Sequence, residues 1–352
     1  MAGQYFNGPM ALPNPNANYL TNIAIKYMQN ASSFMALDPT LVPIGYSNGT
    51  AFSYKVWERA DFNRSEMKLR TRGQAPHQAR YNVKDQTGEI DIYDLEHPID
   101  DEEYFTPEFA PFQRGPAAIE FLSQQTRLKA EEVFSSIIFV PTPWLTSYTG
   151  VASASPTSSQ FSQFDLPTTD LVQFWRKEIL AFSLRTGQVP NRLYLGAQAW
   201  NGHLNNDDLK ERLKYTVLGG AFTGAMPAQA VALAQLIGID KIAVFMGIHN
   251  TGKEGLLETN EFIVDPKGAL LAHVADTPSA EVPSAFYNIL LNGNGQALGK
   301  GQAKSLNFSR GIATDYGVDR RAKVEWYQEF LGMKSKVTAA DLGVFYGNGV
   351  AS

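Results

Sequence analysis

The residues that come nearest to a catalytic motif are Gly247-Ile-His-Asn-Thr-Gly-Lys253, which follow an apolar run typical of a buried strand. Their spacing fits G-x-x-x-x-G-K, a loop whose backbone N–H groups and lysine hold nucleotide phosphates. Such a loop also needs Ser or Thr after the lysine to bind Mg²⁺, and a helix that begins there. Glu254 instead places a carboxylate after the lysine, and Gly255 disfavours a helix start. We interpret 247–253 as a glycine-rich turn and keep a P-loop-type nucleotide-binding enzyme as the less favoured alternative.

The other residues with catalytic or metal-binding potential are isolated or crowded together. The histidines lie too far apart for a metal motif such as H-x-x-x-H: His77, His97, His203, His249 and His273. Asp100, Asp101, Glu102 and Glu103 form one acidic run, whereas a catalytic pair needs two environments that separate the pKa values. Cysteine is absent, which excludes disulfides and thiolate chemistry. We therefore predict no catalytic residue, cofactor or metal site, and a protein that is not an enzyme.

Composition points to a soluble protein with partners. The chain has 352 residues, enough for two domains or for one domain with large excursions. Charged residues make up 18%, below the roughly 25% of typical soluble domains, which favours an oligomer over a plain monomer. The formal charge of −5 argues against tight nucleic-acid binding. No apolar run approaches the roughly 18–20 residues of a membrane span, and the N-terminus lacks signal-peptide features, so we expect cytosolic synthesis.

The stretch 168–216 predicts helix, stop, buried strand, turn and helix. Its first helix has one apolar face, at Leu171, Val172, Trp175, Ile179 and Phe182. We expect Thr168 or Thr169 to cap its start and Gly187 to end it, with Pro190 preventing continuation. The strand would hold Leu193 to Leu195. The order of elements is distinctive while nucleophiles and bases are missing, which indicates an architectural protein.

A long hairpin is predicted upstream of these elements. Apolar and polar residues alternate over 51–57 and again over 81–93, which is typical of two amphipathic strands. Residues 1–46 are proline-rich and irregular, with one short helix expected from Tyr19 to Met28. The apolar side chains of this arm imply that it lies on another surface of its own subunit or of a neighbour.

The predicted hairpin is basic at its tip and acidic at its base. The candidate inter-subunit contacts are Arg59, Arg64, Arg70, Arg72 and Arg80 at the tip, and Asp100, Asp101, Glu102 and Glu103 at the base. Because the two ends lie far apart, the hairpin cannot neutralise itself and is expected to pair with a copy on the next subunit. The alternative is two solvated charge runs, since exposed ion pairs contribute only about 0–1 kcal/mol each.

The strongest periodicity predicts a helix over 115–137. Its apolar face carries Ile119, Leu122, Ala130, Val133 and Ile137, and its polar face carries Gln124, Gln125, Arg127, Lys129, Glu131 and Glu132. Residues 141–167 are rich in Ser, Thr, Pro and Gly and predict a loop. A helix over 227–236, a strand over 241–247, strands around 262–274 and a strand within 318–332 complete an α+β fold.

This succession resembles the major capsid protein family of tailed bacteriophages, which has the Hong Kong 97-type fold. The resemblance spans roughly 50–300 and rests on the order of its motifs: Asp170-Leu171, Thr186-Gly-Gln-Val-Pro-Asn191, Leu193-Tyr-Leu195, Trp200, Leu209 to Lys214, Leu233 to Ile242, Asn250-Thr-Gly, Leu270-Leu271 and Pro283-Ser284. The chain departs from the family in its Thr-Thr-Asp helix start and its serine-rich early loop.

The resemblance implies an N-terminal arm (1–46), an extended loop (47–98), a peripheral domain (99–165 and 301–352) with the spine helix 115–137, and an axial domain (166–300). It further implies hexamers and pentamers of an icosahedral head shell around double-stranded DNA, assembled in the host bacterial cytoplasm and located in the virion. Scaffolding, portal and decoration proteins are the implied partners.

Two alternatives stay open at this point. An encapsulin-like nanocompartment shell would have the same fold. Some family members form Lys–Asn cross-links, for which Lys55, Lys68, Lys84 and Asn348 are the available residues, although no specific pair can be aligned. The triangulation number, host and maturation trigger are not readable from the sequence.

Overall fold

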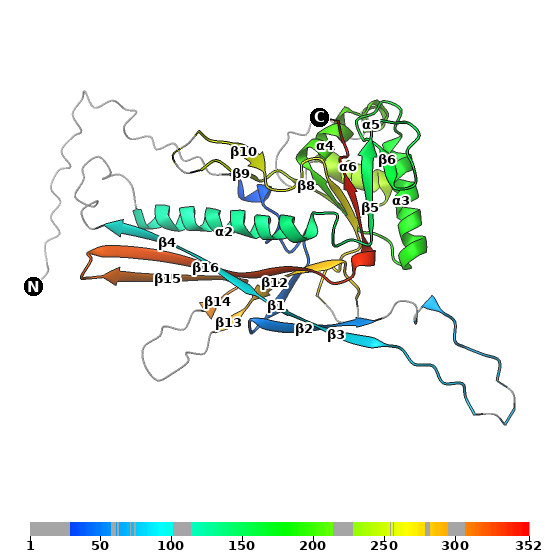
Figure 1. Cartoon of the computed structure of the whole chain (residues 1–352), viewed down its shortest axis with the longest axis horizontal. Helices are drawn as coiled ribbons and strands as arrows, with labels where there is room; N and C mark the ends of the chain where they lie inside the picture. Colours follow the sequence, from blue (N-terminus) through cyan, green and yellow to red (C-terminus); the bar gives the residue numbers. More distant parts are fainter. Residues whose placement is uncertain are drawn as a thin grey trace, which may run out of the picture.

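Two β-sheets and one long helix form the frame of the molecule (Figure 1). The computed structural model describes residues 29–351 except 58–60, 62, 71, 74, 101–113, 214–227, 254, 256, 279–281 and 295–306. The predicted helix Tyr19 to Met28 therefore lies outside the described residues. The α+β class expected from the sequence is confirmed.

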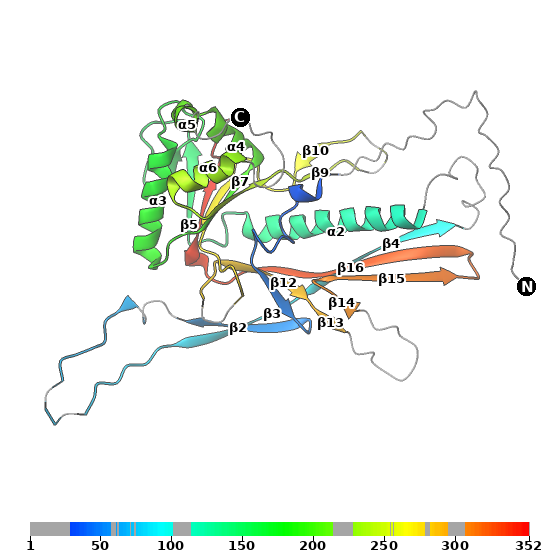
Figure 2. The ribbon, with the colours of Figure 1, turned by 180° about the vertical axis from the view of Figure 1, so that it is seen from behind.

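The first sheet has six strands in the order β6-β5-β17-β11-β7-β8. Helices α3 to α6 gather around it (Figures 1 and 2). Strand β7 is buried at all five positions, as its continuous apolar run predicts. The bounds are β5 (Thr146–Val151), β6 (Gln160–Ser162), β7 (Arg192–Gly196), β8 (Lys241–Phe245), β11 (Ala269–Ala272), β17 (Gly343–Gly347), α3 (Leu171–Thr186), α4 (Ala197–Asn205), α5 (Asp207–Leu213) and α6 (Ala228–Ile237).

The second sheet is built on one long strand, β16, and is covered by the helix α2 (Figure 1). Its order is β1-β12-β16-β15, and β4 also pairs with β16. Helix α2 spans 25 residues, about 37 Å. It confirms the helix predicted over 115–137. The bounds are β1 (Ile44–Ser47), β4 (Asp91–Asp100), α2 (Arg114–Ile138), β12 (Phe286–Leu291), β15 (Ile312–Asp319) and β16 (Val324–Val337).

A two-stranded hairpin projects from this frame (Figure 2). Strands β2 (Ala51–Trp57) and β3 (Val83–Glu89) pair antiparallel from Ala51↔Glu89 to Trp57↔Val83. The return strand expected to run on through Tyr93 instead ends at Glu89. Ile90 is buried at a corner, and the chain then enters β4, which pairs with β16. Two short hairpins complete the structure: β9 (Ile248–Asn250) with β10 (Asn260–Phe262), and β13 (Gly293–Asn294) with β14 (Asn307–Phe308).

Two further local predictions are wrong. Residues 141–167 contain β5 and β6 rather than a loop alone, because a parallel pairing with β17 stabilises a Ser/Thr-rich strand that lacks an apolar run. Asp170, not Thr168 or Thr169, caps α3 by accepting a hydrogen bond from Gln173 N at 2.9 Å. The expected strand within 318–332 is confirmed in β16 from Val324 onward, while Val318 belongs to β15 and Ala322 lies in the turn between the two strands. Gly187 ends α3 in the left-handed conformation, as predicted.

The strand pairings do not follow the domain boundaries expected from the sequence. Strands β5, β6 and β17 fall in the segments expected to be peripheral, yet they belong to the sheet that holds β7 and β8. Strand β12 falls within 166–300, yet it pairs with β16. These pairings depend on hydrogen bonds between segments that are distant in the sequence. The local periodicity of apolar residues does not show which strands pair.

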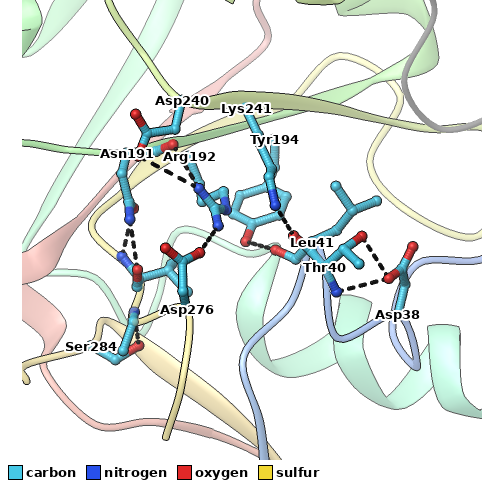
Figure 3. A network of polar contacts seen from close by, with 12 residues as sticks. Asp38, Thr40, Leu41, Asn191, Arg192, Tyr194, Asp240, Lys241, Asp276 and Ser284 are labelled. Atoms are coloured by element: carbon cyan, nitrogen blue, oxygen red, sulfur yellow. Dashed lines mark hydrogen bonds and ion pairs between the residues drawn. The ribbon is translucent and has the colours of Figure 1, made fainter.

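One segment that contacts both sheets is the root of the N-terminal arm, residues 29–47, called the arm root below. Met35, Ala36, Leu41 and Val42 are buried in the main core. Tyr194 Oη on β7 donates to the Leu41 carbonyl at 2.6 Å, and Lys241 Nζ on β8 donates to that of Thr40 at 2.9 Å (Figure 3). From the other sheet, Asn288 Nδ2 on β12 donates to the Ala36 carbonyl at 2.7 Å. The arm root therefore bonds to both sheets.

Gly196, at the end of β7, lies where the backbone of a neighbouring loop packs closely against the first sheet. A Cβ there would overlap the carbonyl oxygens of Asp265 and Pro266, both fixed backbone atoms. We expect Gly196→Ala to lower the free energy of unfolding by about 1–3 kcal/mol, measured by urea denaturation of the soluble subunit. Gly49→Ala is the control, because nothing lies within 4 Å of its Cβ position. Equal effects of the two substitutions would contradict this packing.

Candidate functional site

The glycine-rich segment 247–253 forms part of a hairpin. Asn250 Oδ1 accepts hydrogen bonds from Gly252 N at 2.9 Å and Thr259 N at 3.0 Å, and Thr251 N donates to the Thr259 carbonyl at 2.9 Å. The described residues after Lys253 lead into β10, not into a helix. Two of the N–H groups that a phosphate loop would turn toward its ligand, those of Thr251 and Gly252, are thus used within the hairpin. The geometry agrees with a surface turn.

The histidines are dispersed over the structure. His203 is buried in the first sheet's core, where Nδ1–H donates to the Ala199 carbonyl at 2.7 Å and Nε2 accepts from Trp175 Nε1 at 3.0 Å. Burial lowers the pKa of His203 to about 4, so the ring is neutral near pH 7. His249 Nδ1 lies 3.4 Å from Glu132 Oε1, and the ring of His97 lies against that of Phe121. Within the described ranges, no three His, Cys, Asp or Glu residues are grouped so as to hold a metal ion.

The motif 186–191, which carries much of the resemblance, has a structural role. Asn191 Nδ2 donates to the Val274 carbonyl at 2.7 Å, and Val274 N donates to Asn191 Oδ1 at 2.8 Å (Figure 3). Arg192 is buried beside them and forms an ion pair with Asp276, while its Nη1 lies 3.9 Å from Asp240 Oδ2. The motif fastens the start of β7 to the segment that follows β11.

The serine of Pro283-Ser284 satisfies backbone groups in the same way. Ser284 Oγ donates to the Phe286 carbonyl at 2.9 Å and accepts from Ala275 N at 3.3 Å. Asn348, the cross-linking candidate, has φ 53° and donates its Nδ2 to the Gly150 carbonyl at 2.9 Å. Its amide therefore already holds a turn against β5.

The charged residues predicted to contact a neighbour lie at opposite ends of the molecule. Arg64, Arg70, Arg72 and Arg80 are on the exposed segment between β2 and β3, whereas Asp100 ends β4 at the far end of the second sheet (Figures 1 and 2). Arg64 has local partners, Glu66 at 2.6 Å and Asp61 at 3.6 Å. Arg59, Asp101, Glu102 and Glu103 lie outside the described residues. The pairing of tip and base between copies stays a prediction.

The segment between β2 and β3 also carries an exposed apolar edge that the sequence analysis did not predict. Met67 and Leu69 are 95% and 96% exposed and alternate with Lys68 and Arg70. In an extended chain, alternation places the apolar pair on one side and the basic pair on the other. Large side chains held this far out of the core are typical of a surface that another molecule covers. The period-two pattern of 67–70 was the available signal.

Helix α2 also departs from the predicted polar face. Glu131 and Gln124, assigned to that face, are buried. Both lie under neighbouring elements, and the arm root is what covers Glu131.

In the part of the chain that the structure describes, no helix is both long and apolar enough to cross a membrane.

Comparisons with known proteins bear on the fold. No protein-family model and no curated protein sequence matches the chain. Solved structures do match over nearly its full length. A phage-related protein from Bordetella bronchiseptica RB50 is 17% identical with a TM-score of 0.62, covering 91% of this chain and 94% of that one.

Two phage capsid structures are similar as well. The mature capsid of bacteriophage PhiM1 gives 12% identity and a TM-score of 0.52 over 99% of this chain and 92% of that one. The capsid of Myoviridae phage XM1 gives 8% and 0.53 over 97% and 100%. The chain therefore has the capsid fold of tailed phages, the Hong Kong 97-type fold that its sequence predicts.

His203 predicts an acid-dependent loss of stability. Its folded-state pKa of about 4 lies below the ordinary value of 6.5, so the unfolded chain binds the proton more tightly. The stabilisation is complete above pH 6.5 and is lost as the pH falls toward 4, by up to about 1.4 kcal/mol per pH unit. His203→Gln keeps one donor and one acceptor and should remove this loss, so that its free energy of unfolding in urea rises relative to that of the unmodified protein, by up to about 1.4 kcal/mol per unit, as the pH falls from 6.5 toward 4.5.

The matched control for this titration is His77→Gln, in the exposed segment between β2 and β3. Its profile should follow that of the unmodified protein. Parallel profiles for His203→Gln and the unmodified protein would show that another group sets the acid sensitivity.

Proposed function

We propose that this chain is a major capsid protein that self-assembles into the icosahedral head shell enclosing the double-stranded DNA genome of a tailed phage. The observation that carries the proposal is the likeness to phage capsid structures over nearly the whole of both chains. The proposed role is structural: Asn250 and Thr251 of the glycine-rich segment make hydrogen bonds within a hairpin, and His203 is hydrogen-bonded inside the core.

The form of the subunit supports a shell role. The second sheet and α2 make an elongated layer, and the β2–β3 hairpin carries exposed apolar residues away from the core (Figure 1). A monomer gains nothing from such a hairpin, whereas a neighbour can bury its apolar edge. The net charge of −5 suits a container that encloses DNA without gripping it.

We assign the parts of the subunit by their sheets. The six-stranded sheet with α3 to α6 is the axial domain, and the second sheet with α2 as spine helix is the peripheral domain. The segment between Ala51 and Glu89 is the extended loop, and the arm root leads back to the N-terminal arm. Hexamers and pentamers of this unit form the shell, which is assembled in the host cytoplasm and becomes part of the virion.

Separate proteins complete the particle in this proposal: a scaffolding protein, a portal and a decoration protein. The tip of the extended loop and the acidic run that begins at the end of β4 supply orientation between copies, with Arg59, Arg64, Arg70, Arg72 and Arg80 facing Asp100, Asp101, Glu102 and Glu103 of the next subunit. Exposed pairs of this kind direct register more than they add affinity.

Electron microscopy of the purified full-length chain, expressed with and without a candidate scaffolding protein, tests the assembly. We expect closed shells of uniform size, with regular shells depending on the scaffold. A chain that stays monomeric or dimeric under both conditions would overturn the proposal. Native particles that hold an enzyme instead of DNA would favour the encapsulin-like alternative, and micromolar ATP binding would favour the P-loop enzyme.

A charge-reversal series tests the loop contacts. Arg72→Glu with Arg80→Glu should raise the concentration needed for assembly roughly tenfold, since each exposed pair contributes about 0.5–1 kcal/mol. Adding Asp100→Arg and Asp101→Arg should restore part of the loss. Arg72→Lys with Arg80→Lys is the control and should assemble normally by light scattering. Failure of the rescue would mean that the acidic base is not the partner.

A further inference from the structure

A fully buried carboxylate connects the spine helix to the arm root. Glu131 on α2 has no exposed surface, and its Oε2 accepts hydrogen bonds from Met35 N at 3.0 Å and Ala36 N at 2.8 Å. Its other oxygen, Oε1, has no hydrogen-bond partner among the described residues. Glu131 also lines a cavity of about 240 Å³ between α2 and the arm root.

The surroundings of Glu131 are poor in compensating charge. Arg127 and Asp38 border the same cavity, and Asp38 is engaged with Thr40 through its Oδ1. From the second sheet, the neutral Asn288 donates a hydrogen bond to the Ala36 carbonyl. Burial raises the pKa of Glu131 to about 7 in spite of the two backbone N–H groups that favour the charged form.

Three further charged groups on or beside α2 contact other residues: Glu132, Glu329 and Lys129. Glu132 contacts Lys129 at 3.2 Å and His249 of β9 at 3.4 Å. Glu329 of β16 lies 3.4 Å from Ser123 Oγ, nearer the start of the helix. The Lys129 ammonium lies 5.1 Å from the ring centre of Tyr93 on β4.

We propose that Glu131 is a proton-operated latch that holds the arm root against α2, tight when the carboxyl is protonated and weaker when it is ionised. The protonated group can still accept both backbone N–H bonds on Oε2 while Oε1–H points toward the cavity. Ionisation instead leaves a buried charge with one uncompensated oxygen, which is costly. The arm root bonds to both sheets, so protonation of Glu131 also strengthens the attachment of the two sheets to each other. It does not depend on the proposed shell function.

Opening of the latch returns the carboxyl group to water, where its pKa is ordinary. Between pH 4.5 and about 7 the closed state then keeps a proton that the open state releases. Closure therefore weakens as the pH rises through this window, and the dependence ends above about pH 7. One proton accounts for a change of up to about tenfold in the opening equilibrium per pH unit.

Hydrogen exchange of the Met35 and Ala36 amides tests the latch on the full-length soluble subunit. Rates at pH 5, 6, 7 and 8, corrected for intrinsic exchange, should show protection falling up to about tenfold per unit from pH 5 to 7, with little change from 7 to 8. Glu131→Gln retains an acceptor for both amides and should make the profile flat. Glu132→Gln and Glu329→Gln should leave the fall as it is.

Flat protection in the unmodified protein would overturn the latch, as would an undiminished fall in Glu131→Gln. Should Glu131→Gln not fold, the unmodified profile together with the two control variants decides the question. If the fall in amide protection between pH 5 and 7 disappeared in Glu132→Gln or Glu329→Gln, the titration would belong to that residue and the proposal would be refuted.

Discussion

The two sheets of this protein share one hydrophobic core, and the arm root is a largely irregular stretch of backbone that bonds to both of them. Its carbonyl groups accept hydrogen bonds from β7, β8 and β12, and two of its amides bind a carboxylate on α2. Buried backbone groups must find partners, so an irregular segment inside a core fixes every element that supplies one. The arm root therefore contributes to the placement of both sheets, and the loss of a contact within it would affect the hydrogen bonds to each.

The same requirement explains how a distinctive set of motifs can lack chemistry. Asp170 caps α3, Asn191 bonds both ways to Val274, and Ser284 satisfies groups on either side of it. Each polar residue serves a loop that enters or leaves the first sheet. The motifs lie at the loops between helices and strands, where they satisfy backbone groups. Their order along the sequence is therefore the order in which these loops occur.

Local signals predicted the local elements. The spacing of apolar residues gave α2 and α3, and continuous apolar runs gave β7 and β8. The sequence could not show that β4 leaves the hairpin for β16, because pairing between distant strands depends on the assembled core. Glu131 looked solvent-facing, since charged residues surround it in sequence and the segment that buries it lies 95 residues away. The residues predicted to contact a neighbouring subunit were identified from charge and from alternation alone. These patterns do not identify the residues that they would contact.

The position of β17 has a consequence for the timing of folding. Residues 343–347 pair with β5 on one side and β11 on the other, in the interior of the six-stranded sheet. The ribosome must release residues 343–347 before this strand can enter, so until then β5 and β6 are separated from the rest of their sheet. The first sheet is thus completed only after every strand of the second sheet has been synthesised, which delays the surfaces that a finished subunit offers to its neighbours.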